Sequence, residues 1–169
     1  MKKKLTSRQY FAKLQTIHAG IIAGVVIFGA LSFLIPNATA LQDDELLTIL
    51  EYVTLAVVLA GVGSGLMQYR RRIPVIANHE NMQHKMASLY SAQISRWTMM
   101  ALPPVVCAVN YWVMHSIIFL AAFGFLVSIL AILFPSKKKT IRDLQLIPKD
   151  IEVIQKSDAV VAVWEAEQV

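Results

Sequence analysis

The side chains best suited to metal or acid–base chemistry are four histidines and a few acidic residues near them. Glu80 and His84 are spaced i, i+4, so on a helix they would share one side and could supply two ligands to a metal ion. His79 would face another side, and His18 and His115 lie at opposite ends of apolar segments. A metal centre usually has about three or four protein ligands. We therefore predict no metal site and interpret Glu80 with His84 as a solvated contact.

Patterns for covalent or phosphoryl-transfer chemistry are missing from the sequence. Cys107 is the single cysteine and lies in an apolar stretch, where we expect a packed thiol. The chain has no nucleophile beside a base, no paired carboxylates and no glycine-rich phosphate loop. We predict that the protein is not an enzyme and that it binds no cofactor.

Arg70, Arg71 and Arg72 form a cationic cluster directly after an apolar segment. Such a cluster orients a membrane protein and contacts lipid phosphates, which is the interpretation we favour. The alternative is a site for an anionic cofactor of a membrane enzyme.

Long apolar segments must position these residues. Of the 169 residues, 56% are hydrophobic and 16% are charged, whereas a soluble domain has about 25% charged residues. Stretches long enough for transmembrane helices lie at residues 17–35, 52–67, 97–113 and 116–134. We predict an all-α membrane protein with a four-helix transmembrane bundle at residues 1–135, arranged as two hairpins, and a cytoplasmic amphipathic tail at residues 136–169.

The basic residues predict the orientation in the membrane. All sixteen fall in three clusters, at residues 2–13, 70–96 and 137–156. Four crossings place every cluster on one side, and the positive-inside rule makes that side the cytoplasm, with both termini. Their role in orientation leaves no reason to expect a nucleic-acid partner. A signal peptide cleaved after Ala38-Thr39-Ala40 is the alternative, but the first apolar run of 19 residues exceeds a typical signal core.

Prolines and acidic residues mark the expected helix ends. Pro36 follows the first span and Pro135 the fourth, while Asp43 and Asp44 are placed to cap the second. These positions predict short outer connections between the spans.

The connection between the second and third spans is long and basic. We expect a turn at residues 70–74, then a cytoplasmic helix at 78–95 that continues into the third span. Pro103 and Pro104 fall inside that span and predict a kink. Asn110 is its deepest strongly polar side chain and is interpreted as a hydrogen-bonding contact to a neighbouring helix.

Small residues in the first two spans allow close helix packing. They are Gly20, Gly24, Gly61, Gly63 and Gly65. Packing inside the first hairpin is the favoured interpretation, and a homo-oligomer interface is the other.

Two apolar stripes outside the spans could dock on a partner. The first consists of Met82, Met86 and Leu89, with Gln93, and the second of Leu144, Ile147, Ile151 and Ile154. The second stripe predicts one short amphipathic helix that lies on the membrane, docks on the first stripe or binds another protein. Residues 159–164 are too short to span and could be strand or helix.

The layout resembles a group of small four-helix inner-membrane proteins of bacteria. A basic amino end leads to Thr16-Ile17-His18 and a glycine-rich span, and Asp143-Leu144-x-Leu146 follows the last span. The resemblance covers most of the chain and implies this fold and the bacterial inner membrane. It implies no activity.

The chain also resembles two other families, but it differs from each of them in a feature that is characteristic of that family. The glycine-rich hairpins and the basic loop at 70–74 resemble rotor proteolipids of rotary ATPases, which need a carboxylate at mid-membrane. The acid nearest to a span, Glu51, lies about one turn from an outer end. The arginines with Glu80-Asn81 are similar to four-helix enzymes of eicosanoid and glutathione metabolism, but that family has its basic loop after the first helix.

The sequence thus predicts a non-catalytic multi-pass protein of the bacterial inner membrane that contacts membrane lipid. We expect a subunit or scaffold of a membrane assembly, as a homo-oligomer or with other membrane subunits. The alternative is a small oligomeric channel or transporter, with a path near Pro103, Pro104 and Asn110. A membrane enzyme that uses the basic loop is a third possibility.

Overall fold

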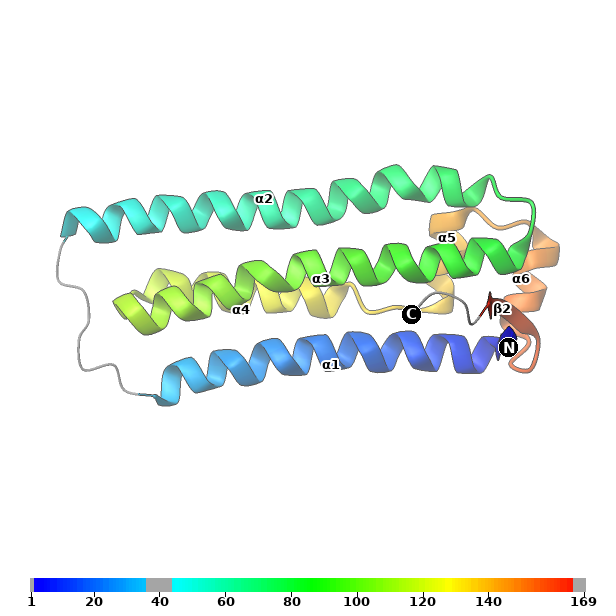
Figure 1. Cartoon of the computed structure of the whole chain (residues 1–169), viewed down its shortest axis with the longest axis horizontal. Coiled ribbons are helices and arrows are strands. Elements are labelled where there is room, and N and C mark those ends of the chain that lie inside the picture. The colour runs from blue at the N-terminus through cyan, green and yellow to red at the C-terminus, as the bar shows by residue number, and fades with distance from the viewer. Residues whose placement is uncertain (1, 36–43, 166–169) are drawn as a thin grey trace. The chain divides into compact units, whose positions relative to one another are not determined.

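A computed structural model describes residues 2–35 and 44–165 of the chain. Those residues form six helices and two short strands (Figure 1). In chain order they are β1 (Lys2–Thr6), α1 (Ser7–Leu34), α2 (Asp44–Ala77), α3 (Met82–Met114), α4 (Ile117–Ile132), α5 (Lys137–Leu144), α6 (Pro148–Gln155) and β2 (Val160–Glu165). The predicted helical class is confirmed, with the strand pair as an addition.

Three helices, α1, α2 and α3, are long and apolar enough to cross a membrane. α2 has 34 residues and α3 has 33, so each is about 50 Å long and exceeds the roughly 30 Å hydrocarbon core. α4 has only 16 residues, and it meets the same test only together with α5, from which it is bent by 81°. The protein therefore has the helices of a multi-pass membrane protein.

The chain divides into two compact units, each built from separate segments of sequence. The basic unit comprises Met1–His18, Met67–Ser95 and Phe134–Val169, and the apolar unit comprises Ala19–Leu66 and Arg96–Leu133. Fifteen of the sixteen lysines and arginines belong to the basic unit. The boundary expected at residue 135 is a different division, between a membrane bundle and a cytoplasmic tail. It stays a prediction.

The two strands of the basic unit pair in antiparallel orientation. Lys4 lies opposite Val163 and Leu5 opposite Ala162, and the register shifts between Leu5 and Thr6. Leu5 and Ala162 are buried. Because a lone two-stranded sheet is marginally stable in water, this pair depends on the helices that cover it, and β2 contacts α6.

The first turns of α1 connect the strand pair to other helices of the basic unit. Ser7 is fully buried, and its Oγ donates a hydrogen bond to the Ile154 carbonyl oxygen of α6. Tyr10 is also fully buried, and its hydroxyl donates to the Met86 carbonyl oxygen of α3 over 2.8 Å. Both hydroxyls can be buried because each has a partner.

Glycines let helices approach closely in the apolar unit, where the helix segments run alongside one another (Figure 1). A Cβ atom on Gly61 of α2 would lie 2.5 Å from Cγ of Pro103 of α3. One on Gly65 would lie 2.9 Å from Cγ of Met100. A larger residue at Gly61 would therefore have to displace Pro103, and one at Gly65 would have to displace the Met100 side chain.

Aromatic residues fill another part of the apolar unit. Gly29 of α1 faces the ring of Phe123 of α4, so a Cβ there would collide with the ring. Phe33 and Tyr111 pack with ring centroids 4.5 Å apart. The Trp112 indole donates to the Ile35 carbonyl oxygen over 3.2 Å, which joins α3 to the end of α1.

The basic turn predicted at residues 70–74 is wrong. α2 continues through it to Ala77, with Pro74 inside the helix. Pro74 has no N–H, so the Arg70 carbonyl loses its usual helical partner. Ile76 is buried beyond the proline, and its packing helps to offset the missing hydrogen bond.

The actual turn lies at residues 78–81. Asn81 Oδ1 accepts a hydrogen bond of 2.8 Å from the Gln83 N–H, so Asn81 caps α3. α3 consequently begins at Met82 instead of residue 78, and it continues to Met114. The predicted continuity of the helix after this turn with the third apolar stretch is confirmed.

The tail forms two short helices where one was expected. α5 ends at Leu144, the next residue has a left-handed backbone with φ of 46°, and α6 begins with Pro148. Proline fits the first turn of a helix, as predicted. Residues 160–165 are a strand. The expected roles of Pro36 and Asp43 lie outside the described residues.

Candidate functional site

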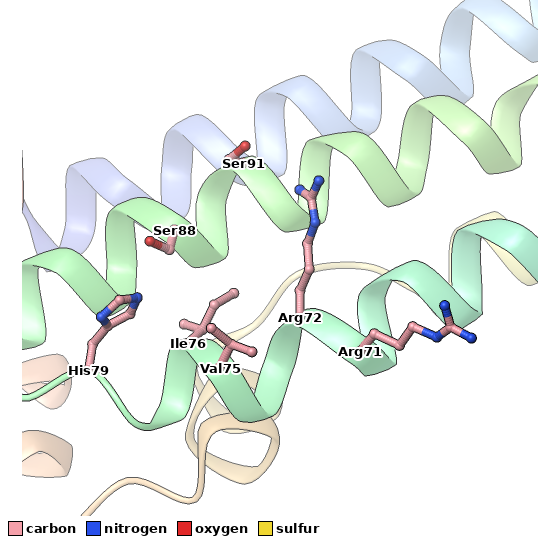
Figure 2. Close-up of a pocket in the computed structure, with 7 residues that line it drawn as sticks. All are labelled: Arg71, Arg72, Val75, Ile76, His79, Ser88 and Ser91. Atoms are coloured by element: carbon pink, nitrogen blue, oxygen red, sulfur yellow. The ribbon is translucent and has the colours of Figure 1, made fainter.

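A groove in the basic unit lies between the end of α2 and the first part of α3 (Figure 2). Its volume of about 380 Å³ falls within the range of about 300–1,000 Å³ for small-molecule sites. The lining residues are Arg71, Arg72, Val75, Ile76, His79, Ser88 and Ser91. The groove thus combines positive charge, hydroxyl groups and aliphatic surface.

Figure 2 shows how the polar side chains lie in this groove. Arg72 extends from α2 toward α3, and the His79 ring is turned toward Ser88. Arg71 extends away from the other labelled side chains. Arg72 is therefore the cation best placed to contact a ligand there.

The two guanidinium groups of the groove are not neutralised by neighbours. Within residues 2–35 and 44–165, neither Arg71 nor Arg72 forms a hydrogen bond or ion pair, and no carboxylate lines the groove. Both arginines are exposed. An arginine stays protonated in proteins, so the groove carries positive charge that an anion can neutralise.

Several acidic residues of the basic unit are engaged elsewhere. The pairs are Asp143 with Arg142 at 3.3 Å, Asp150 with Lys85 at 3.8 Å and Glu152 with Lys156 at 2.7 Å. The hydrogen bond from Lys156, reinforced by its charge, lowers the pKa of Glu152. Asp143 also accepts a hydrogen bond of 3.0 Å from the Tyr69 hydroxyl. None of these three carboxylates lines the groove.

The predicted arginine cluster is divided by the helix. Arg71 and Arg72 line the groove, whereas Arg70 is exposed and does not belong to its lining. Successive helical residues point about 100° apart, so three in a row cannot share one face. Sequence reasoning missed Ser88 and Ser91, although their i, i+3 spacing places both on one face of α3.

The pairing of Glu80 with His84 on one helix is wrong. α3 begins at Met82, so Glu80 lies in the preceding turn and the helical spacing does not apply. Of the other histidines, His18 packs edge-on against Phe134 in the basic unit, with ring centroids 5.6 Å apart. Within the described part of the chain, no group of three or more His, Cys, Asp or Glu residues could hold a metal ion.

The first predicted stripe, at the start of α3, is largely covered by the chain itself. Met86 and Leu89 are fully buried, and Met82 is half-buried. Tyr10 contacts this helix through the Met86 carbonyl. Lys85, on the same helix, forms an ion pair with Asp150 of α6.

The tail stripe is buried only in part. Leu144 and Ile154 are buried, Ile151 is half-buried, and Ile147 is 58% exposed. The break between α5 and α6 explains this difference, because Ile147 lies in the connection and not on the face of a helix. Leu144 and Ile154 thus belong to the core of the basic unit.

The five glycines of interest have different surroundings. Gly61 and Gly65 pack against α3, as described above. A Cβ atom on Gly20, Gly24 or Gly63 would meet no atom within 4 Å. The Gly20 and Gly24 pair therefore takes no part in close packing within the described chain.

Pro103 and Pro104 are buried, and α3 remains helical through both. Near the other end of this helix segment, the Asn110 side-chain amide donates a hydrogen bond to Thr54 Oγ1 of α2. Thr54 in turn donates to the Leu50 carbonyl oxygen over 2.8 Å. This chain of hydrogen bonds joins α2 to α3 in the way expected for Asn110.

Glu51, the acid nearest to the apolar segments, lies on α2. Its Oε1 accepts a hydrogen bond of 3.3 Å from the hydroxyl of Ser116, which precedes α4. Glu51 therefore connects two elements of the apolar unit.

Family models, curated protein sequences and solved structures compared with this chain give no match. The resemblances stated from the sequence accordingly stay predictions.

Proposed function

We propose that this protein is a non-catalytic multi-pass protein of the bacterial inner membrane that serves as a subunit or scaffold of a membrane assembly. One observation carries the proposal. The Gly20 and Gly24 pair on α1 is open, with no atom within 4 Å of the position of an added Cβ. Small residues four positions apart in a membrane helix permit another helix to approach its backbone.

The open surface continues along the same side of α1. Ile27 is 60% exposed and Leu31 is 48% exposed, and they follow Gly24 by three and seven residues. By contrast, Gly61 and Gly65 are already occupied by α3. The two glycine pairs therefore have separate roles in this proposal, with Gly61 and Gly65 for internal packing and Gly20 and Gly24 for assembly.

The partner that we propose for this surface is a second copy of the chain or another membrane subunit, surrounded by membrane lipid. Lipid tails are as apolar as a helix surface, so contact in a membrane depends on close packing. A face made of small residues supports such packing better than the α2 surface, where Tyr52 is 70% exposed and Leu59 is 65% exposed.

We also propose four crossings with both termini in the cytoplasm. Pairing of β1 with β2 supports this, because strands on opposite sides of a bilayer cannot share backbone hydrogen bonds. α1, α2 and α3 alone would give an odd number of crossings, so α4 supplies the fourth. The concentration of fifteen basic residues in one unit supports the cytoplasmic orientation of that unit.

The test uses the whole chain extracted in mild detergent, with its mass measured by native mass spectrometry. We expect a homo-oligomer or a complex with a companion subunit, and a shift to the monomer in Gly20→Leu and Gly24→Leu. Gly63→Leu is the matched control, because Gly63 is equally open but lies on α2. A wild-type protein that is monomeric without a companion would contradict the proposal, as would an equal effect of the control.

A further inference from the structure

We propose that the groove between α2 and α3 binds a phosphate group, carried by the head of an anionic membrane lipid. Arg72 is the principal contact, and Arg71 supplies a second positive charge. Ser88, Ser91 and His79 provide polar groups for the remainder of the lipid head. This site goes beyond the role in assembly and depends on different residues.

The chemistry of the lining selects a phosphate. A guanidinium group is planar and forms two parallel hydrogen bonds to phosphate oxygens, which makes arginine well suited to this ligand. Arg72 extends across the groove toward α3 (Figure 2). Neither arginine is paired within the described residues, and no carboxylate of the lining would compete with an anion for them.

The position of Arg72 along α2 selects a lipid as the source of that phosphate. The uncharged apolar stretch of α2 ends at Met67, and Arg72 follows five residues later, about 7.5 Å along the helix axis. The head-group layer extends about 5–8 Å beyond each side of the hydrocarbon core. With α2 crossing as proposed above, Arg72 lies at the level of the lipid phosphates.

The rest of the groove fits a head group that carries hydroxyls. From Arg72 the lining continues along α2 to His79, with Ser91 and Ser88 on α3. The His79 ring is turned toward Ser88 (Figure 2). Hydroxyl and imidazole groups both donate and accept hydrogen bonds, so they suit a glycerol head better than the methylated cation of a choline head. Phosphatidylglycerol is therefore the probe that we choose.

The experiment measures lipid binding to the full-length protein by native mass spectrometry, with phosphatidylglycerol or phosphatidylcholine titrated into the detergent solution. We expect the wild-type protein to prefer phosphatidylglycerol by about tenfold or more, because both lipids carry a phosphate but the choline cation is repelled by the arginines and lacks the glycerol hydroxyls that hydrogen-bond to the lining. Equal binding of the two lipids would overturn the proposal.

Arginine variants locate the site. Arg72→Gln should lose about tenfold in affinity for phosphatidylglycerol, and the double variant with Arg71→Gln should lose more. Arg70→Gln is the matched control, because it removes the same charge from the adjacent residue outside the groove. If Arg70→Gln and Arg72→Gln weaken binding equally, general attraction by a basic surface explains the data and the site is excluded.

A conservative variant, a folding control and soluble competitors complete the experiment. Arg72→Lys retains the charge without the planar fork, so its affinity for phosphatidylglycerol should lie between those of the wild type and Arg72→Gln. Unchanged helical circular dichroism shows that all variants are folded.

Inorganic phosphate and glycerol 3-phosphate are then added as soluble competitors. If neither soluble phosphate displaces the lipid, the result supports a membrane lipid as the source of the bound phosphate. Displacement by either at millimolar concentration supports the phosphate site but overturns the assignment to lipid.

Discussion

Ser7 Oγ donates a hydrogen bond of 2.5 Å to the carbonyl oxygen of Ile154, which joins the first residue of α1 to the last turn of α6. Both residues are fully buried. A second hydrogen bond, from the Ser7 N–H to the Ala159 carbonyl oxygen over 2.8 Å, lies beside it. The two ends of the described chain are thus held together by Ser7 as well as by the β1–β2 pair.

The Ser7→Ala variant should lower the free energy of unfolding by about 1–2 kcal/mol. The substitution removes the donor and leaves the buried Ile154 carbonyl without it. Ser157→Ala is the control, because that side chain is exposed and should change stability by about 0.5 kcal/mol or less. Denaturant titration of both variants in the same detergent measures the difference. Equal stabilities would contradict the contribution assigned to the Ser7 hydrogen bond.

Cysteines introduced as Lys4→Cys and Val163→Cys should form a disulfide within one chain, because these residues are cross-strand partners. The native Cys107 is replaced by alanine so that it cannot compete. Oxidation followed by cleavage in the turn at residues 78–81 should leave the two fragments joined on a non-reducing gel. Each single-cysteine variant serves as a control and should give separate fragments. Separate fragments from the double variant as well would contradict the strand pairing.

The Gly61→Ala substitution should destabilise the protein by about 1–3 kcal/mol, a typical cost of overpacking. The new methyl group would lie 2.5 Å from Cγ of Pro103, and a buried proline ring has little freedom to move. Gly63→Ala is a close control, two residues away on the same helix, where a Cβ meets no atom within 4 Å. Gly63→Ala should be neutral or slightly stabilising, since alanine favours helix. Unfolding of both variants, followed by circular dichroism, makes the comparison.

Asn110 and Thr54 should show energetic coupling in a double-mutant cycle. Asn110→Ala, Thr54→Ala and the double variant isolate their hydrogen bond, which should contribute about 0.6–1.7 kcal/mol, as measured for such contacts in membrane helices. A coupling energy indistinguishable from zero would mean that the contact holds α2 and α3 together no better than apolar packing. The unfolding free energies of all four proteins in one detergent provide the measurement.

The long apolar elements could be predicted because their signal is contained in each segment. Runs without charge, such as residues 17–35, identify a membrane helix by composition and length. The same reasoning placed a break at residues 70–74, since arginines and a proline are typical of connections. It was wrong there because Ile76, on the far side of Pro74, packs in the basic unit and keeps α2 helical.

The strand pair and the groove could not be predicted because both depend on contacts between distant segments. β1 has the sequence Lys-Lys-Lys-Leu-Thr, which has no alternating pattern and few residues that favour strands. Its partner begins at Val160. The groove likewise needs α2 and α3 to bring Arg72 and Ser91 to one place. The sequence predicted the arginines as a charge cluster. No pattern in the neighbouring residues indicated which serines would lie across the groove from them.

Pairing of β1 with β2 sets an order of events during biosynthesis. The chain emerges from the ribosome at about 5–20 residues per second, so roughly 8–30 seconds pass between the synthesis of Thr6 and that of Val160. Throughout that interval the first strand has no partner, although the helices after it are already being inserted. The nascent protein therefore has an unpaired first strand until β2 has been synthesised, and termination before β2 would leave that strand available to chaperones and proteases.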